Sequence, residues 1–142
     1  MTVAFRLDSV APGLAEHFRR APTTNRRRAA QLACERAVLA ADLAAPVVGE
    51  ALAALRGVGA ADGSLRERLD SLSAWFDDEY FQLSEDALTP RALACFYRAR
   101  AASVLALATG ADESQLHEAI YESVAAHRDP AELVRLIEAA LG

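Results

Sequence analysis

The amino-acid sequence predicts an all-α fold, a single-domain bundle of about six to seven helices over residues 1–142. Three observations lead to this prediction. Alanine, the strongest helix former, is the most frequent residue. Apolar residues recur at steps of three and four, as on one face of a helix, and strand-like alternation of useful length is missing. Nearly all of the five Pro and seven Gly fall between the periodic segments, where they mark helix ends.

The chain opens with residues 1–8, a short mixed stretch for which we expect an extended conformation. A first helix is predicted from about Ser9 or Ala11 to Arg20, because Pro22 disfavours helical conformation in the residue before it. A second helix is predicted after this proline, with a threonine as its cap, over about 24–44.

The third predicted helix starts at Pro46, since proline suits the first helical position, and it ends at the glycine-rich sequence 56–59. The fourth, over 64–84, carries the clearest amphipathic stripe of the chain. The stripe consists of Leu65, Leu69, Leu72, Phe76, Tyr80 and Leu83. A fifth helix is predicted to start at Thr89-Pro90 and to end at Gly110.

Two capping signals predict the last two helices. Residues 112–115 have the spacing of a capping box, with acids in the first turn, and predict a helix that reaches about His127. Residues 129–132 repeat the box with proline at the first helical position, and predict a helix that ends near Leu141.

Charge is distributed unevenly along the chain. The net charge is −5, and every basic residue is Arg. Residues 1–61 carry eight Arg and five acids, whereas residues 62–142 carry seven Arg and fifteen acids. The acidic balance argues against a nucleic-acid-binding protein.

A basic cluster does flank the first turn between helices, and we expect it either to meet anionic groups or to pair partly with Glu16 and Glu35. It consists of Arg19, Arg20, Arg26, Arg27 and Arg28.

An acidic segment with aromatic residues occupies the end of the helix predicted over 64–84. Exposed aromatic side chains beside carboxylates are typical of a protein-binding patch. The alternative is a solvated acidic face beside aromatics at the edge of the core. The predicted partner-binding residues are Trp75, Asp77, Asp78, Glu79, Tyr80, Glu85 and Asp86. We also expect these acids to pair with Arg98 and Arg100, which lie in an apolar part of the next helix.

The sequence lacks a recognisable catalytic or metal-binding motif. The run 117–121 resembles the zinc-protease helix, but Tyr121 stands where the second histidine ligand is required. Glu118 and Glu122 share a helical face, which fits a metal site only if further ligands converge. A solvated pair of like charges is the alternative. We therefore predict no metal, no cofactor and no enzymatic activity.

Compartment is predicted from two features. Cys34 and Cys95 each sit among small apolar residues, so we expect reduced, buried thiols. Neither a signal peptide nor a long uninterrupted apolar run is present in the sequence, which predicts a cytoplasmic protein without a membrane span.

Three segments, 72–83, 96–103 and 118–122, resemble a group of small helical bacterial proteins, the immunity proteins of polymorphic or contact-dependent toxin systems. The resemblance covers about residues 65–141 and rests on amphipathic-helix patterns. It implies a protein that binds one toxin and blocks its active site, with no catalytic residues of its own. An acidic face would suit a basic nuclease toxin.

The sequence thus predicts a protein-binding helical domain that neutralises a basic toxin through its acidic surface. One alternative is a ligand-binding or regulatory domain, with a closed apolar pocket between the helices predicted over 64–84, 89–110 and 113–127 and with Arg100 or His127 at its wall. The others are a metal-binding or enzymatic bundle using Glu118, Glu122 and His127, and a homodimer whose function is assembly.

Overall fold

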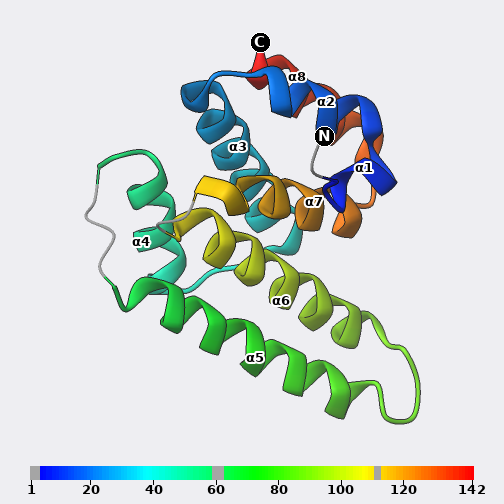
Figure 1. Ribbon diagram of the computed structural model, residues 1–142. Coiled ribbons are helices and arrows are strands. Elements are labelled where there is room, and N and C mark those ends of the chain that lie inside the picture. The colour runs from blue at the N-terminus through cyan, green and yellow to red at the C-terminus, as the bar shows by residue number, and fades with distance from the viewer. Residues whose placement is uncertain (1–3, 59–62, 111–112) are drawn as a thin grey trace.

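A computed structural model describes residues 4–58, 63–110 and 113–142, and its fold is all-α. No strand occurs among these described residues. The helices are α1 (Leu7–Val10), α2 (Pro12–Arg20), α3 (Thr23–Ala41), α4 (Pro46–Leu55), α5 (Leu65–Leu83), α6 (Pro90–Thr109), the 3-10 helix η1 (Glu113–Gln115), α7 (Leu116–Ala126) and α8 (Pro130–Leu141). Figure 1 shows α3 and α7 lying between a group formed by α1, α2 and α8 and a group formed by α4, α5 and α6.

Proline fixes the starts of four helices. It is the first residue of α2, α4, α6 and α8, where its missing N–H costs no hydrogen bond. Two of the predicted caps are confirmed. Thr89 Oγ1 accepts a hydrogen bond from the Ala92 N–H at 3.1 Å, and Asp129 Oδ1 accepts one from the Glu132 N–H at 3.4 Å. The predicted box at 112–115 begins outside the described residues, and its other three residues form η1.

One prediction near the N-terminus was wrong. Residues 1–3 lie outside the described part, but Leu7 and Asp8 belong to α1 and are not extended. Leu7 is completely buried, and the Asp8 carboxylate accepts a hydrogen bond from the Phe5 N–H at 2.7 Å. Of the two starts expected for the first helix, the later one is confirmed, since α2 follows Ala11 and ends at Arg20; Ala11 has a φ of −152°, which is not helical, because it precedes Pro12.

The helix expected to reach residue 44 ends three residues earlier. Asp42 adopts a left-handed conformation with φ of 52°, and the Leu43 N–H donates back to the Val38 carbonyl at 3.1 Å. This closing bond pattern ends a helix as a glycine would. At the end of α4 the predicted glycine stop is confirmed, since Gly57 has a φ of 74°.

The interior consists of two hydrophobic clusters. One is built by α1, α2, the first half of α3, α7 and α8, around Leu14, Ile120 and Ile137. The other is built by the second half of α3, α4, α5 and α6, around Leu69 and Leu105. Alanine is the commonest residue in the buried set. Small side chains of this kind let helix backbones approach closely but leave little apolar volume to fill gaps.

The central helix, α6, packs against α3, α4, α5 and α7. It is long and apolar enough to satisfy the length and composition criteria for a membrane-spanning helix. Half of its most apolar window is buried inside the protein, as in the core helix of a globular fold.

Candidate functional site

The end of α5 and the start of α6 form a helical hairpin that projects from the rest of the protein (Figure 1). We call residues 74–98 of this hairpin the arm. On α5, the buried residues are Leu65, Leu69 and Ser73, so full burial on this helix stops where the arm begins, whereas Ala92 and Cys95 on α6 remain buried. The two helices are joined at this boundary by the Ser73 hydroxyl, which lies 3.0 Å from the Ala99 carbonyl and 3.0 Å from the Ser103 hydroxyl. Beyond it, α5 and α6 have mainly each other to pack against.

The arm concentrates the aromatic residues of the protein. All aromatic residues except Phe5, Phe18 and Tyr121 lie in it. Trp75 is 56% exposed and Phe81 is 68% exposed, and Leu88 in the connecting loop is exposed as well. Large apolar side chains that stay in water at one end of a molecule are typical of an interaction surface.

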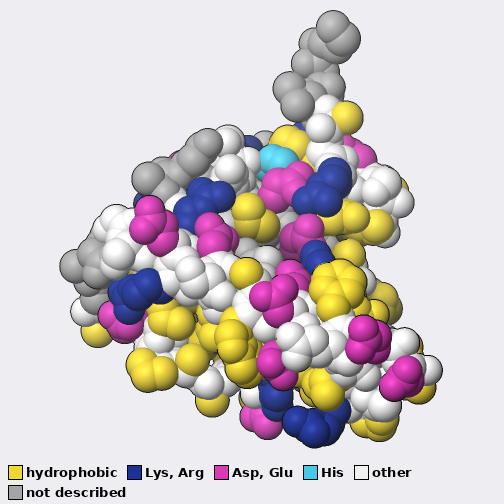
Figure 2. All heavy atoms as spheres, turned by 90° about the horizontal axis from the view of Figure 1, so that it is seen from below, with side chains coloured by type: hydrophobic (Ala, Val, Ile, Leu, Met, Phe, Trp, Pro, Cys, Tyr) yellow, Lys and Arg dark blue, Asp and Glu magenta, His cyan; other side chains and the backbone are white. Residues whose placement is uncertain are grey.

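The predicted acidic residues surround these aromatics. Asp78, Glu85 and Asp86 are exposed, and Asp77 and Glu79 are partly buried. Within the part of the chain that the structure describes, none of these five carboxylates forms an ion pair. Trp75, Asp78 and Phe81 follow one another at steps of three, so they share one side of α5. Figure 2, seen from the side of α5, shows acidic side chains interspersed with hydrophobic ones.

Tyr80 has a different environment from the other predicted partner-binding residues. It is partly buried, and its ring lies 5.6 Å from the ring of Phe96 on α6. A further edge contact of 5.6 Å joins Phe96 to Tyr97. Tyr80 therefore belongs to a row of aromatic contacts that holds the two helices of the arm together.

The expected pairing of the arm acids with Arg98 and Arg100 was wrong. Arg100 Nη1 lies 3.7 Å from Glu122 Oε2 on α7, and Arg98 Nε donates to the Ala41 carbonyl at 3.2 Å. Both arginines therefore contact the body, Arg98 at the end of α3 and Arg100 on α7, and not the arm acids. Among the described residues, the carboxylates of the arm consequently remain without a basic partner.

Structural contacts account for most of the basic cluster. Arg26 donates to the carbonyls of Phe18 at 2.8 Å and Arg19 at 2.5 Å, so it caps the C-terminus of α2. The predicted pairing with Glu16 is confirmed for Arg19 and Arg20, at 3.6 and 3.1 Å. Glu35, by contrast, pairs with Arg56 at 3.4 Å.

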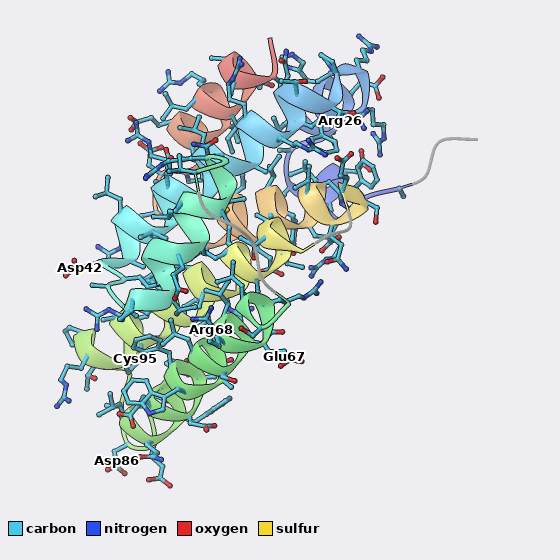
Figure 3. The ribbon with its side chains drawn as sticks, turned by 90° about the vertical axis from the view of Figure 1, so that its left-hand side faces the viewer. Arg26, Asp42, Glu67, Arg68, Asp86 and Cys95 are labelled. Carbon is cyan, nitrogen blue, oxygen red and sulfur yellow. The ribbon has the colours of Figure 1, made fainter. Side chains whose placement is uncertain are left out.

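Arg27 of the same cluster pairs with Glu113. Figure 3 places Arg26 and Asp86 at opposite ends of the molecule. The basic and acidic regions are therefore separate surfaces.

Glu118 and Glu122 are also held by arginine. Both carboxylates accept hydrogen bonds from the Arg6 guanidinium, and the guanidinium lies over the Tyr121 ring at 4.4 Å. Across the described residues, no group of three or more His, Cys, Asp or Glu is arranged to hold a metal ion. The pair therefore anchors the N-terminal segment to α7.

A pocket of about 260 Å³ opens between α3, α6 and α7, next to the turn that leads into α8. Arg100 and His127 both lie at its wall, as the alternative of a ligand-binding domain predicts. Two details of that prediction were wrong. The pocket is open to solvent, and its third helix is α3 and not the helix over 64–84, because α5 packs on the other side of α6. Sequence periodicity has no signal for this hollow, which results from small residues meeting on three helices.

Comparisons with protein-family models, curated proteins and solved structures gave no significant match.

Proposed function

We propose that this protein is a binding domain whose arm docks onto a basic surface of another protein. The observation that supports this most directly is the exposure of Trp75 and Phe81 beside carboxylates that have no basic partner in the described structure. A protein that used the arm only to complete its own core would bury these rings.

The two kinds of side chain have different roles in the proposed complex. Burial of Trp75 and Phe81 in a partner supplies affinity, since truncation of such an anchor typically costs 2 kcal/mol or more, about thirtyfold in Kd. The carboxylates steer the encounter and reject acidic partners, so they mainly affect the association rate and its dependence on salt.

The resemblance to immunity proteins suggests the class of partner. In that proposal the partner is a toxin domain with a basic active-site cleft, and the protein neutralises it by occlusion. In such a complex the acidic side chains of the arm occupy the positions that phosphates of a nucleic-acid substrate would take. These are Asp77, Asp78 and Glu79 on α5, and Glu85 and Asp86 after it.

The test is binding between the purified protein and the product of a neighbouring toxin-like gene, measured by titration calorimetry at low and high salt. The variant with Asp77→Arg and Asp78→Arg is expected to weaken binding about tenfold or more at low salt. The matched control is Glu67→Arg with Asp70→Arg, because both of these residues are exposed on the inner part of the same helix. Tight binding that survives reversal at 77 and 78 would show that the arm is not the contact surface.

The aromatic anchors have their own control. Trp75→Ala with Phe81→Ala is expected to weaken binding at every salt concentration, whereas Leu39→Ala, at a residue 72% exposed on α3, is expected to leave it unchanged. Self-association of the arm is the competing use of this surface. Self-association would bring like charges together, so we expect light scattering to show a monomer. A dimer that dissociates when Trp75 is replaced by Ala would favour assembly over partner binding.

A further inference from the structure

The pocket between α3, α6 and α7 has an apolar floor made almost entirely of alanine. Its floor residues are Ala37, Ala40, Ala41, Ala101, Val104 and Ala126. Three helices meet here with side chains too short to fill the space between them. An apolar cavity of about 150 Å³ is enough to hold benzene, so about 260 Å³ accommodates one ring with a small substituent.

The acidic groups at the rim are already engaged by the protein. Glu122 Oε1 accepts a hydrogen bond from the Arg6 guanidinium at 3.0 Å, and Asp129 caps the first turn of α8. The Ser123 hydroxyl, at the same wall, donates to the Ala33 carbonyl at 3.1 Å. These acceptors are therefore satisfied before any ligand enters.

The donors at the rim are in surplus. The Arg100 Nε–H is buried and has no hydrogen-bond partner in the described part of the chain, even though the guanidinium lies 5.3 Å from the Phe96 ring and 3.7 Å from Glu122. Arg128 lies over the Tyr97 ring at 5.5 Å, and within the described residues it has no carboxylate partner. His127 Nδ1 accepts the Asp129 N–H at 3.1 Å, so its Nε2 carries the proton in the neutral ring and is a further donor.

We propose that this pocket binds a small aromatic monocarboxylate, with the ring on the alanine floor and the carboxylate on Arg100 and Arg128. The Arg100 side chain is 38% exposed and Arg128 is exposed, so the Nη–H groups of both can make charge-assisted hydrogen bonds to a carboxylate. A phosphate ester or a dicarboxylate fits less well, because its polar groups would desolvate against methyl groups. The site is separate from the outer face of the arm, so the inference stands independently of the proposed function.

The test uses benzoate as the probe, with its neutral isostere benzamide as the chemical control. Binding is measured by calorimetry and mapped by the chemical shifts of the Ala methyl groups and of the Tyr97 ring. We expect saturable benzoate binding, with benzamide about tenfold weaker or more because it lacks the charge. Benzamide that binds as tightly as benzoate would overturn the assignment of an anion site.

Two variants locate the site. Ala126→Leu places a larger side chain in the pocket and is expected to abolish benzoate binding, whereas Ala125→Leu, at the neighbouring exposed residue, is expected to preserve it. Arg128→Gln removes an exposed guanidinium without disturbing the core and is expected to weaken benzoate about tenfold. Absence of saturable binding, or wild-type affinity in both Ala126→Leu and Arg128→Gln, would refute the proposal.

Discussion

Replacing Arg26 with alanine tests whether the basic cluster is structural. Its guanidinium reaches back from the first turns of α3 to the last carbonyls of α2, and it also lies over the Phe18 ring at 5.0 Å. The Arg26→Ala variant loses all three contacts and leaves two carbonyls of a helix end without this donor.

The expected loss can be worked out from these contacts. A hydrogen bond contributes about 0.5–1.5 kcal/mol, and more when one group is charged, so for the partly exposed Arg26 we assign about 1 kcal/mol to each of its two bonds. The contact with the Phe18 ring adds about 0.5 kcal/mol. Removing a positive charge near the N-terminus of α3 returns about 0.3–0.5 kcal/mol. The net loss is about 2 kcal/mol. For 142 residues the entropy of unfolding is about 0.3 kcal/mol/K, so Tm is expected to fall by about 7 °C.

Thermal unfolding followed by circular dichroism measures this change. The matched control is Arg28→Ala, because Arg28 is exposed two residues further along the same helix and experiences a similar helix dipole. We expect that variant to be unchanged or slightly more stable. Equal Tm values for the two variants would refute the capping role, and the basic cluster around Arg26 would again be a candidate binding surface.

Two further predictions concern the core and its pH dependence. Ile120→Ala, at a completely buried residue, is expected to lower the free energy of unfolding by about 2–5 kcal/mol, against less than about 0.5 kcal/mol for Leu39→Ala, as measured by urea denaturation. Equal effects would mean that α7 does not hold the core. Burial lowers the pKa of His117, which stacks on the Phe5 ring at 3.8 Å, and the nearby Glu118 opposes this shift only in part. Because the folded-state pKa lies below the unfolded value of about 6.5, stability is expected to decrease as pH falls below 7, and less so in His117→Phe. Parallel pH profiles for the two proteins would contradict this role of His117.

Local chemistry determined the helix boundaries. The signals that set these boundaries act within one turn of the chain, so the sequence predicts the helix ends without knowledge of the fold. They are the prolines at 46, 90 and 130, the caps at Thr89 and Asp129, and the glycine at 57. One failure is also local in origin, because a left-handed Asp42 is rarer than a left-handed glycine. The other is not local: α1 stands where an extended segment was expected, and its Leu7 is buried in the core.

Contacts between distant segments were decided only by the tertiary structure. An arginine in an apolar part of a helix needs a carboxylate, but Arg100 pairs with Glu122 and not with the arm acids because α7 packs against α6. The same holds for Arg26 and for the pocket, since each depends on which helices meet. The periodic stripe of α5 continues to Leu83, but the last fully buried residue of α5 is Ser73, and Phe76, Tyr80 and Leu83 are only partly buried. Periodicity predicts which side of a helix is apolar. How much of that side is buried depends on how far the neighbouring helices extend along it.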